Sequence, residues 1–283
     1  MKEINIEDKI NINKLSYLYN LLYGEIVFGS VEKSKEFISE LKISKETLYF
    51  INYLNEQINE KEFFVLKNFS ESKYDLIALC HLLGREIFLS NRIGSYVYGF
   101  TTEPFSNDFS KNLKPGFFHT DFSAEKKTPN YIILQCEQVD PRFPYYGRNQ
   151  FASVKKILNR LEELFPNITE KLLDMRLPYK FLDFADSEVS LLTKFGDSFQ
   201  IRFHPGLVDY TKLNESHFVD GNCITEIIEA VALEVCNDIC LDRGDLLVVS
   251  NKSMLHRRGE CTVRFHHSIR KWDGRRINTI RFY

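Results

Sequence analysis

The sequence predicts an α+β fold in which a strand-rich interior closes into a jelly roll or a barrel, with helices outside it. Short apolar runs bounded by turn residues recur along the chain, whereas helical periodicity is confined to the N-terminal part and one long insertion. The runs do not alternate with helices, which argues against a doubly wound parallel sheet. A closed double sheet holds ligands at its mouth, where residues far apart in sequence meet.

The 283 residues are expected to form a single domain, because no Pro-, Gly- or Ser-rich tract, charge block or repeat divides them. Residues 1–60 are expected to be a helical N-terminal support, and about 62–283 the core with its helical insertion. A formal charge of −2 gives no general attraction to nucleic acid or anionic membranes, and no apolar run is long enough to span a membrane. Six scattered cysteines and a charged N-terminus favour a cytoplasmic protein.

Four helices are expected from apolar residues at helical spacing. Ser44 is expected to cap the first, Gly84 to end the second, which begins near Ser70, and Ser153 to cap the third. The fourth spans residues 224–239.

Strands are expected where short apolar runs lie between turn residues. These runs cover residues 62–66, 95–99, 131–136, 179–182, 191–195, 199–203 and the apolar part of 241–251. The last run leads directly to His256.

The stretch from Phe117 to Ser123 contains a candidate metal site. In an extended chain residues i and i+2 point to the same side, so His119 and Asp121 can direct an imidazole nitrogen and a carboxylate to one point. His256 is the candidate third ligand. Two histidines and one carboxylate leave open coordination positions, an arrangement typical of non-haem Fe(II) oxygenases. A histidine flanked by phenylalanines could instead be a hydrogen-bonded core residue.

Three segments match the pattern of one enzyme group. They are Glu62–Phe69, Phe118–Asp121, and the run Leu241–Asn251 followed by Leu255–Arg258. From about residue 62 the chain resembles the taurine dioxygenase and clavaminate synthase-like family of Fe(II)/2-oxoglutarate-dependent oxygenases. The resemblance implies a double-stranded β-helix (jelly-roll) core flanked by helices. It also implies Fe(II), 2-oxoglutarate and O2 as cofactors, with His119, Asp121 and His256 as metal ligands.

The C-terminal segment Gly274–Arg281 resembles the closing strand that, in this family, supplies an arginine to the distal carboxylate of 2-oxoglutarate. A guanidinium suits that role because its planar fork makes two charge-assisted hydrogen bonds to a carboxylate. The role is assigned to Arg276, which is expected to face the barrel interior. Arg270 and the neighbouring Arg275 remain alternatives. Asn149 lies where the family often has a threonine against the same cosubstrate.

The resemblance implies a dioxygenase that hydroxylates a small polar molecule, with a free amino acid or a derivative as the first choice. Arg281 and His204 are expected to contact that substrate. Desaturation or cyclisation by the same family, in specialised metabolism, is one alternative. A catalytically silent jelly-roll protein that binds a metal or small ligand is another. No nucleic-acid or membrane partner is expected, and a homo-oligomer is left open.

Overall fold

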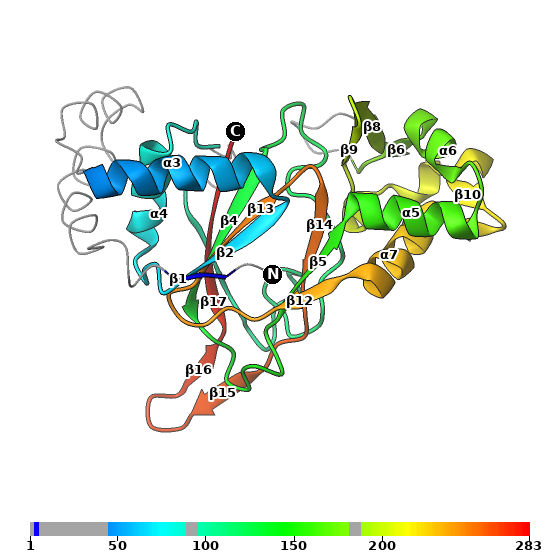
Figure 1. Ribbon diagram of the computed structural model, residues 1–283. Helices are drawn as coiled ribbons and strands as arrows, with labels where there is room; N and C mark the ends of the chain where they lie inside the picture. The colour runs from blue at the N-terminus through cyan, green and yellow to red at the C-terminus, as the bar shows by residue number, and fades with distance from the viewer. Residues whose placement is uncertain (1–2, 6–44, 89–95, 181–187) are drawn as a thin grey trace.

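A computed structural model describes residues 3–5, 45–88, 96–180 and 188–283 of the chain. Two antiparallel β-sheets form its centre, and helices cover both outer sides (Figure 1). Within these residues, no helix combines the length and apolar character needed to cross a lipid bilayer.

The larger sheet has six strands in the order β1, β2, β13, β4, β17, β3. Neighbouring strands are antiparallel except for β1 and β2, which are parallel. The bounds are β1 Glu3–Asn5, β2 Phe63–Lys67, β3 Tyr98–Thr101, β4 Tyr131–Gln138, β13 Leu246–Ser250 and β17 Arg276–Phe282.

The smaller sheet has three antiparallel strands in the order β12, β5, β14. They cover Asn237–Ile239, Asn149–Ser153 and Met254–Arg258. Buried apolar side chains from both sheets pack into one layer between them, and these include Val65, Ile132, Phe151, Leu247 and Met254. This double sheet is the predicted jelly-roll core.

Helices cover the outer face of each sheet (Figure 1). Helices α3 (Lys45–Glu60) and α4 (Lys73–Leu82) pack on the larger sheet, where Leu54 and Leu76 meet Ile133 and Val248. The outer side of the smaller sheet packs against α5 (Val154–Leu164), α6 (Ile168–Asp174) and α7 (Ile224–Val235). Apolar residues of α5 recur at intervals of three and four, which gives the helix one buried face.

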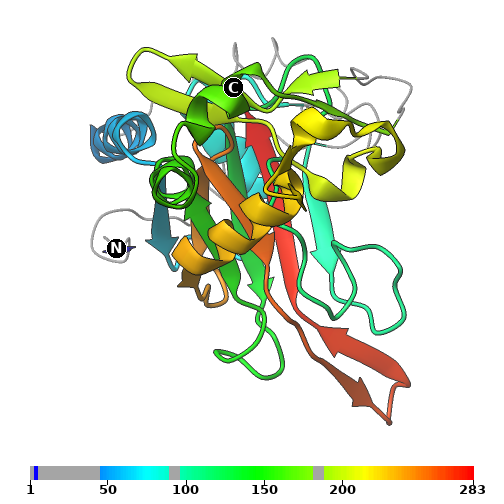
Figure 2. The same ribbon diagram turned by 90° about the vertical axis from the view of Figure 1, so that its right-hand side faces the viewer.

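The long insertion after α6 consists of short strand pairs and 3-10 turns. Its strands are β6 Arg176–Pro178, β7 Glu188–Ser190, β8 Leu192–Phe195, β9 Ser198–Ile201, β10 Phe218–Val219 and β11 Asn222–Cys223, and its 3-10 turns are Pro205–Leu207, Tyr210–Lys212 and Glu215–His217. A separate hairpin, β15 (Val263–His266) with β16 (Lys271–Gly274), projects from the body of the molecule (Figure 2).

Several predicted elements are confirmed, and Gly84 ends the second helix in the left-handed conformation that glycine tolerates. The prediction of one helix over 224–239 is wrong in its last turn. The helix ends at Val235, and Asn237–Ile239 instead pairs with β5, because the chain here forms an edge of the smaller sheet. The predicted strand at 95–99 is shifted to Tyr98–Thr101.

The N-terminal 60 residues are not purely helical, since Glu3–Asn5 pairs with β2 as a strand. Ser153 does precede α5, but its hydroxyl donates to Glu62 instead of capping the helix. Ser44 and part of the predicted strand 179–182 lie outside the described residues.

Candidate metal centre and ligand cavity

The backbones of His119 and His256 are hydrogen-bonded to each other. Each peptide N–H donates to the carbonyl oxygen of the other residue at 3.0 Å, which makes an isolated antiparallel bridge. His256 lies on β14, and β14 pairs with β5. The smaller sheet therefore positions one histidine, and the bridge brings the 117–123 stretch alongside it.

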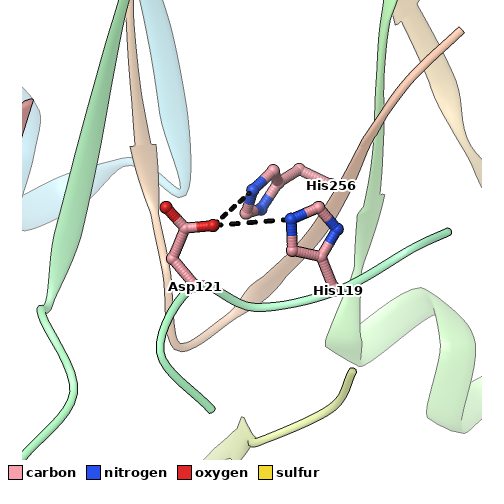
Figure 3. A group of neighbouring side chains, drawn as sticks. All are labelled: His119, Asp121 and His256. Carbon is pink, nitrogen blue, oxygen red and sulfur yellow. Dashed lines mark ion pairs between the residues drawn. The ribbon is translucent and has the colours of Figure 1, made fainter. Parts of the chain in front are cut away.

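Asp121 completes a cluster of three potential metal ligands (Figure 3). Its Oδ1 lies 3.4 Å from the Nε2 of His119 and 3.4 Å from the Nε2 of His256. The three ligand atoms all lie within 4.8 Å of one another. As predicted, the cluster brings together two imidazoles from distant parts of the chain and one carboxylate.

Hydrogen bonds prepare two of these groups for a cation. Nδ1 of His119 lies 2.8 Å from the carbonyl oxygen of Phe117, so it carries the proton and leaves the lone pair of Nε2 facing the cluster. The second carboxylate oxygen of Asp121 accepts a hydrogen bond from Arg281. Burial raises the pKa of the Asp121 carboxyl, but Arg281 and the two histidines outweigh burial and hold that pKa well below its usual range. The donor set is therefore suited to a divalent transition metal such as Fe(II).

Asn251, in the turn between β13 and β14, holds the backbone of Asp121. Its Oδ1 accepts the Asp121 N–H at 2.7 Å, and its Nδ2 donates to the Asp121 carbonyl at 3.0 Å. The same amide also donates to the Pro129 carbonyl. Asn251 is buried, so no water can easily replace these bonds. The residue thus ties the carboxylate ligand to the turn that precedes His256.

The cluster lines a cavity of about 260 Å³ between the two sheets. Its walls come from β3, β4, β5, β14 and β17, together with the loop of residues 103–118. On β17 the lining residues alternate along the strand as Ile277, Thr279 and Arg281, the period expected for one face of a strand.

Arg275, directly before β17, continues this alternation and also lines the cavity. It is buried, and within the described part of the chain it makes no ion pair. Its guanidinium donates to Oδ1 of Asn149, another lining residue. Burial lowers the pKa of Arg275, but a guanidinium stays protonated even so. A buried cation without a counter-ion is costly, so this part of the cavity is suited to an anionic ligand.

The expectation that Arg276 faces the interior is wrong. Its side chain is exposed on the opposite side of the strand, where it pairs with Glu137 and Gln138. Arg270 lies in the exposed turn between β15 and β16 and does not line the cavity. The physical reason is the two-residue period of a strand, which places Arg276 on the face opposite to Arg275 and Arg281.

His204 lines the same cavity beside the metal cluster. Its ring centroid lies 4.9 Å from that of His119. The backbone of the preceding residue, Phe203, is tied to Thr120: its carbonyl accepts the Thr120 N–H, and its N–H donates to the Thr120 hydroxyl. Burial, followed by the nearby His119, lowers the pKa of His204 to about 3, so the imidazole is neutral.

Apart from Phe117 and Phe118 at its end, sequence reasoning did not single out the loop of residues 103–118. Asp108, Phe109 and Phe117 from this loop line the cavity, and the rings of Phe109 and Phe117 lie 5.1 Å apart. Arg258 holds the loop by donating to the carbonyl oxygens of Phe109 and Lys114. The loop has neither strand nor helix periodicity, so local sequence patterns do not predict that it covers the cavity.

A family model described as taurine catabolism dioxygenase TauD, TfdA family matches residues 38–206, which is more than half of the chain. The chain belongs to the TauD/TfdA family. As a TauD/TfdA protein it is an Fe(II)- and 2-oxoglutarate-dependent oxygenase, and its cofactors are Fe(II), 2-oxoglutarate and O2. The match includes His119 and Asp121 and ends before His256.

Solved structures of similar fold extend over nearly the whole TauD/TfdA chain. An asparagine oxygenase in complex with Fe(II), (2S,3S)-3-hydroxyasparagine and succinate has a TM-score of 0.74 at 14% identity, covering 99% of this chain and 93% of that chain. The non-heme iron oxygenase OrfP, with Fe, succinate and (3S)-hydroxy-L-Arg, has a TM-score of 0.71 at 13% identity, covering 100% and 94%. A taurine dioxygenase from Burkholderia xenovorans has a TM-score of 0.58 at 13% identity, covering 85% and 82%. At these identities the similarity establishes the shared fold.

The role of Asn251 leads to a first prediction. Asn251→Ala removes both bonds to the Asp121 backbone and is expected to destabilise the fold by about 1–3 kcal/mol. It should also weaken metal binding roughly 10- to 100-fold, because the carboxylate ligand is no longer held in place. Denaturant unfolding and calorimetric titration with Mn(II) would measure the two effects. Asn222→Ala, at an exposed amide in the insertion, is the matched control, and unchanged metal affinity in Asn251→Ala would contradict the assignment.

Proposed function

We propose that the chain hydroxylates a free amino acid, or a close derivative, and in doing so converts 2-oxoglutarate and O2 to succinate and CO2. The observation that carries this proposal is the buried guanidinium of Arg275, which forms no ion pair with any described residue and lies in the same cavity as the metal cluster. In this assignment the chain acts as a single oxygenase domain in the cytoplasm.

His119, Asp121 and His256 would hold the iron. The three residues supply one ligand atom each and line the cavity, so further coordination positions would remain for the cosubstrate and O2. Arg281 keeps Asp121 ionised and orients its second oxygen, which leaves the first for the metal.

Arg275 would bind the distal carboxylate of 2-oxoglutarate. Asn149 accepts a hydrogen bond from the Arg275 guanidinium, and its own amide lies 3.5 Å from the Ile239 carbonyl. This holds the guanidinium in place and leaves its other N–H groups for a carboxylate. Leu134 and Ile277 supply apolar walls of the same cavity, which strengthen a charge-assisted bond by excluding water.

The substrate would lie near Arg281, His204 and the loop of residues 103–118. Arg281 can attract a substrate carboxylate, because only one of its donors is used by Asp121. Asp108, at the exposed end of the cavity, can accept an ammonium group, since one of its carboxylate oxygens is held by Ser110. A cation and an anion in one small cavity suit a zwitterionic amino acid.

Bound Fe(II), 2-oxoglutarate and O2 supply the oxidising chemistry, in which one oxygen atom goes into succinate and the other into a C–H bond of the substrate. The contributions of the chain are binding and positioning. Arg275 and Arg281 hold the carboxylates of cosubstrate and substrate, while Phe109 and Phe117 limit the access of water.

The similar structures agree with an amino-acid substrate. The asparagine oxygenase and OrfP structures each contain a hydroxylated amino acid together with succinate. The same jelly-roll fold thus accommodates amino-acid hydroxylation in those proteins, which supports the choice of substrate class for this chain.

The contrast between two adjacent arginines is the second prediction. Arg275→Gln should weaken 2-oxoglutarate binding roughly 10- to 100-fold, because hydrogen bonds to a charged group are lost in a buried site. The matched control is Arg276→Gln, which removes the neighbouring, exposed guanidinium and should leave binding unchanged. Anaerobic calorimetry on metal-loaded protein measures both. An effect of Arg276→Gln as large as that of Arg275→Gln would overturn the assignment.

The third prediction tests the reaction itself. With Fe(II), 2-oxoglutarate and a panel of free amino acids, the purified protein should form succinate together with an amino acid that has gained one oxygen atom. His256→Ala should lose this activity, whereas His266→Ala, on the projecting hairpin, should keep it. Mass spectrometry identifies the product. A product that has lost two hydrogens would instead indicate desaturation or cyclisation, and succinate formation that does not depend on iron would contradict the proposal.

A further inference from the structure

His204 occupies a distinctive place in the cavity, because neither of its ring nitrogens has a partner in the described residues. Nδ1 is buried and makes no hydrogen bond. Nε2 makes no hydrogen bond or ion pair with a described residue. A buried nitrogen without a partner costs on the order of 1–3 kcal/mol. Such a group in a ligand cavity is expected to find its partner in the ligand.

The backbone of His204 is held firmly, although its imidazole lacks a hydrogen bond. The backbone N–H of His204 donates to the hydroxyl of Tyr179 at 3.1 Å, and that hydroxyl in turn donates to the Arg202 carbonyl. Tyr179 is almost fully buried. The backbone of His204 is therefore fixed from behind, which sets the point from which its ring enters the cavity.

Gly206 makes room for the ring. A Cβ atom at this position would lie 3.2 Å from Cε1 of His204 and 3.5 Å from the ring of Phe117. A side chain at this position would therefore require the imidazole to shift by a few tenths of an ångström, whereas its contact with Phe117 would be an ordinary one. His204 and Phe117, which both lie against Gly206, form one wall of the cavity next to His119.

The carboxylates around this wall do not offer a buried salt bridge to a cationic substrate side chain. Among the described lining residues the carboxylates are Asp108 and Asp121, and Asp121 is occupied by Arg281 and the two histidines. Asp108 lies at the exposed end, away from a buried position. A cationic side chain beside His204 would therefore lack a buried counter-ion, which is costly.

We propose that His204 determines the specificity of the reaction by hydrogen-bonding an uncharged polar group on the substrate side chain, such as a carboxamide or a hydroxyl. An imidazole offers one donor and one acceptor, which complements a group that both accepts and donates. The inference rests on the proposed amino-acid hydroxylation and narrows its substrate class. It distinguishes uncharged polar side chains from acidic, basic and apolar ones.

Amino acids of nearly equal shape test this proposal. Asparagine is compared with aspartate and leucine, glutamine with glutamate and methionine, and threonine with valine. In at least one set, kcat/KM for the uncharged polar member should exceed that for its charged and apolar counterparts by about 10- to 100-fold. Arginine and lysine complete the panel. A charged or apolar amino acid as the best substrate would overturn the inference, whereas no turnover of any amino acid would overturn the proposed function as well.

Variants assign the preference to the residue. His204→Leu removes both nitrogens and should abolish the preference over the apolar counterpart, chiefly through a higher KM for the polar substrate. His204→Gln restores a donor and an acceptor and should recover part of the preference. His267→Leu, on the exposed hairpin, is the matched control. A preference that survives in His204→Leu would contradict the proposal.

Gly206→Ala provides a test that keeps the imidazole. Its added methyl group would lie 3.2 Å from Cε1 of His204, so the ring has to move by a few tenths of an ångström. The same preference should fall although the imidazole itself is kept. Circular dichroism verifies the fold of each variant. If the displaced ring leaves the ratio of kcat/KM values unchanged, His204 does not contact the substrate side chain.

Discussion

Two backbone hydrogen bonds between His119 and His256 hold the candidate metal site together. The two histidines are far apart in sequence, and nothing local brings them together. One reaches the bridge from the stretch after the 103–118 loop and the other from β14. The bridge forms only because the smaller sheet presents β14 beside that stretch, so the fold and the metal ligands depend on the same contact.

Further hydrogen bonds hold the segment from His119 to Asp121 in place. Asn251 ties the Asp121 backbone to the turn before β14, and Phe203 pairs with Thr120 on the other side. The ligand segment is thus held between two neighbours before any metal arrives. Such preorganisation is what a metal site requires, because its ligands must keep their positions while cosubstrate and substrate change.

Charge is distributed unevenly in the cavity, and this unevenness indicates where ligands bind. Arg281 and Asp121 form an ion pair, so each of these charges has a counter-ion within the protein. Arg275 is equally buried and has no acidic partner in the described residues. A buried pair can be structural, but a buried single charge lined up with a cavity is best explained by a bound counter-ion.

Much of this arrangement could be predicted from sequence, since the candidate metal ligands follow from local spacing and a family motif. His119 and Asp121 are two residues apart, and His256 follows a run of buried strand residues. The expectation that Arg276 faces the interior failed because it depends on which face of β17 the residue occupies. A shift of one residue reverses the face, and the register of β17 against β4 is irregular between Arg276 and Ile277.

Other errors also arose from tertiary structure. The apolar pattern of residues 224–239 is helical throughout, yet pairing with β5 turns Asn237–Ile239 into a strand. The 103–118 loop has no periodicity at all, and only the hydrogen bonds from Arg258 place its aromatic residues over the cavity. These features depend on partners far away in sequence, which local patterns do not encode.

The most direct test of the central claim is an anaerobic crystal structure of the protein with Fe(II) and 2-oxoglutarate. We expect one metal ion about 2.0–2.2 Å from His119, Asp121 and His256, the range known for imidazole and carboxylate ligands of a similar divalent ion. The distal carboxylate of 2-oxoglutarate should lie against Arg275. Metal bound away from these three residues, or a distal carboxylate paired with a different arginine, would contradict the account.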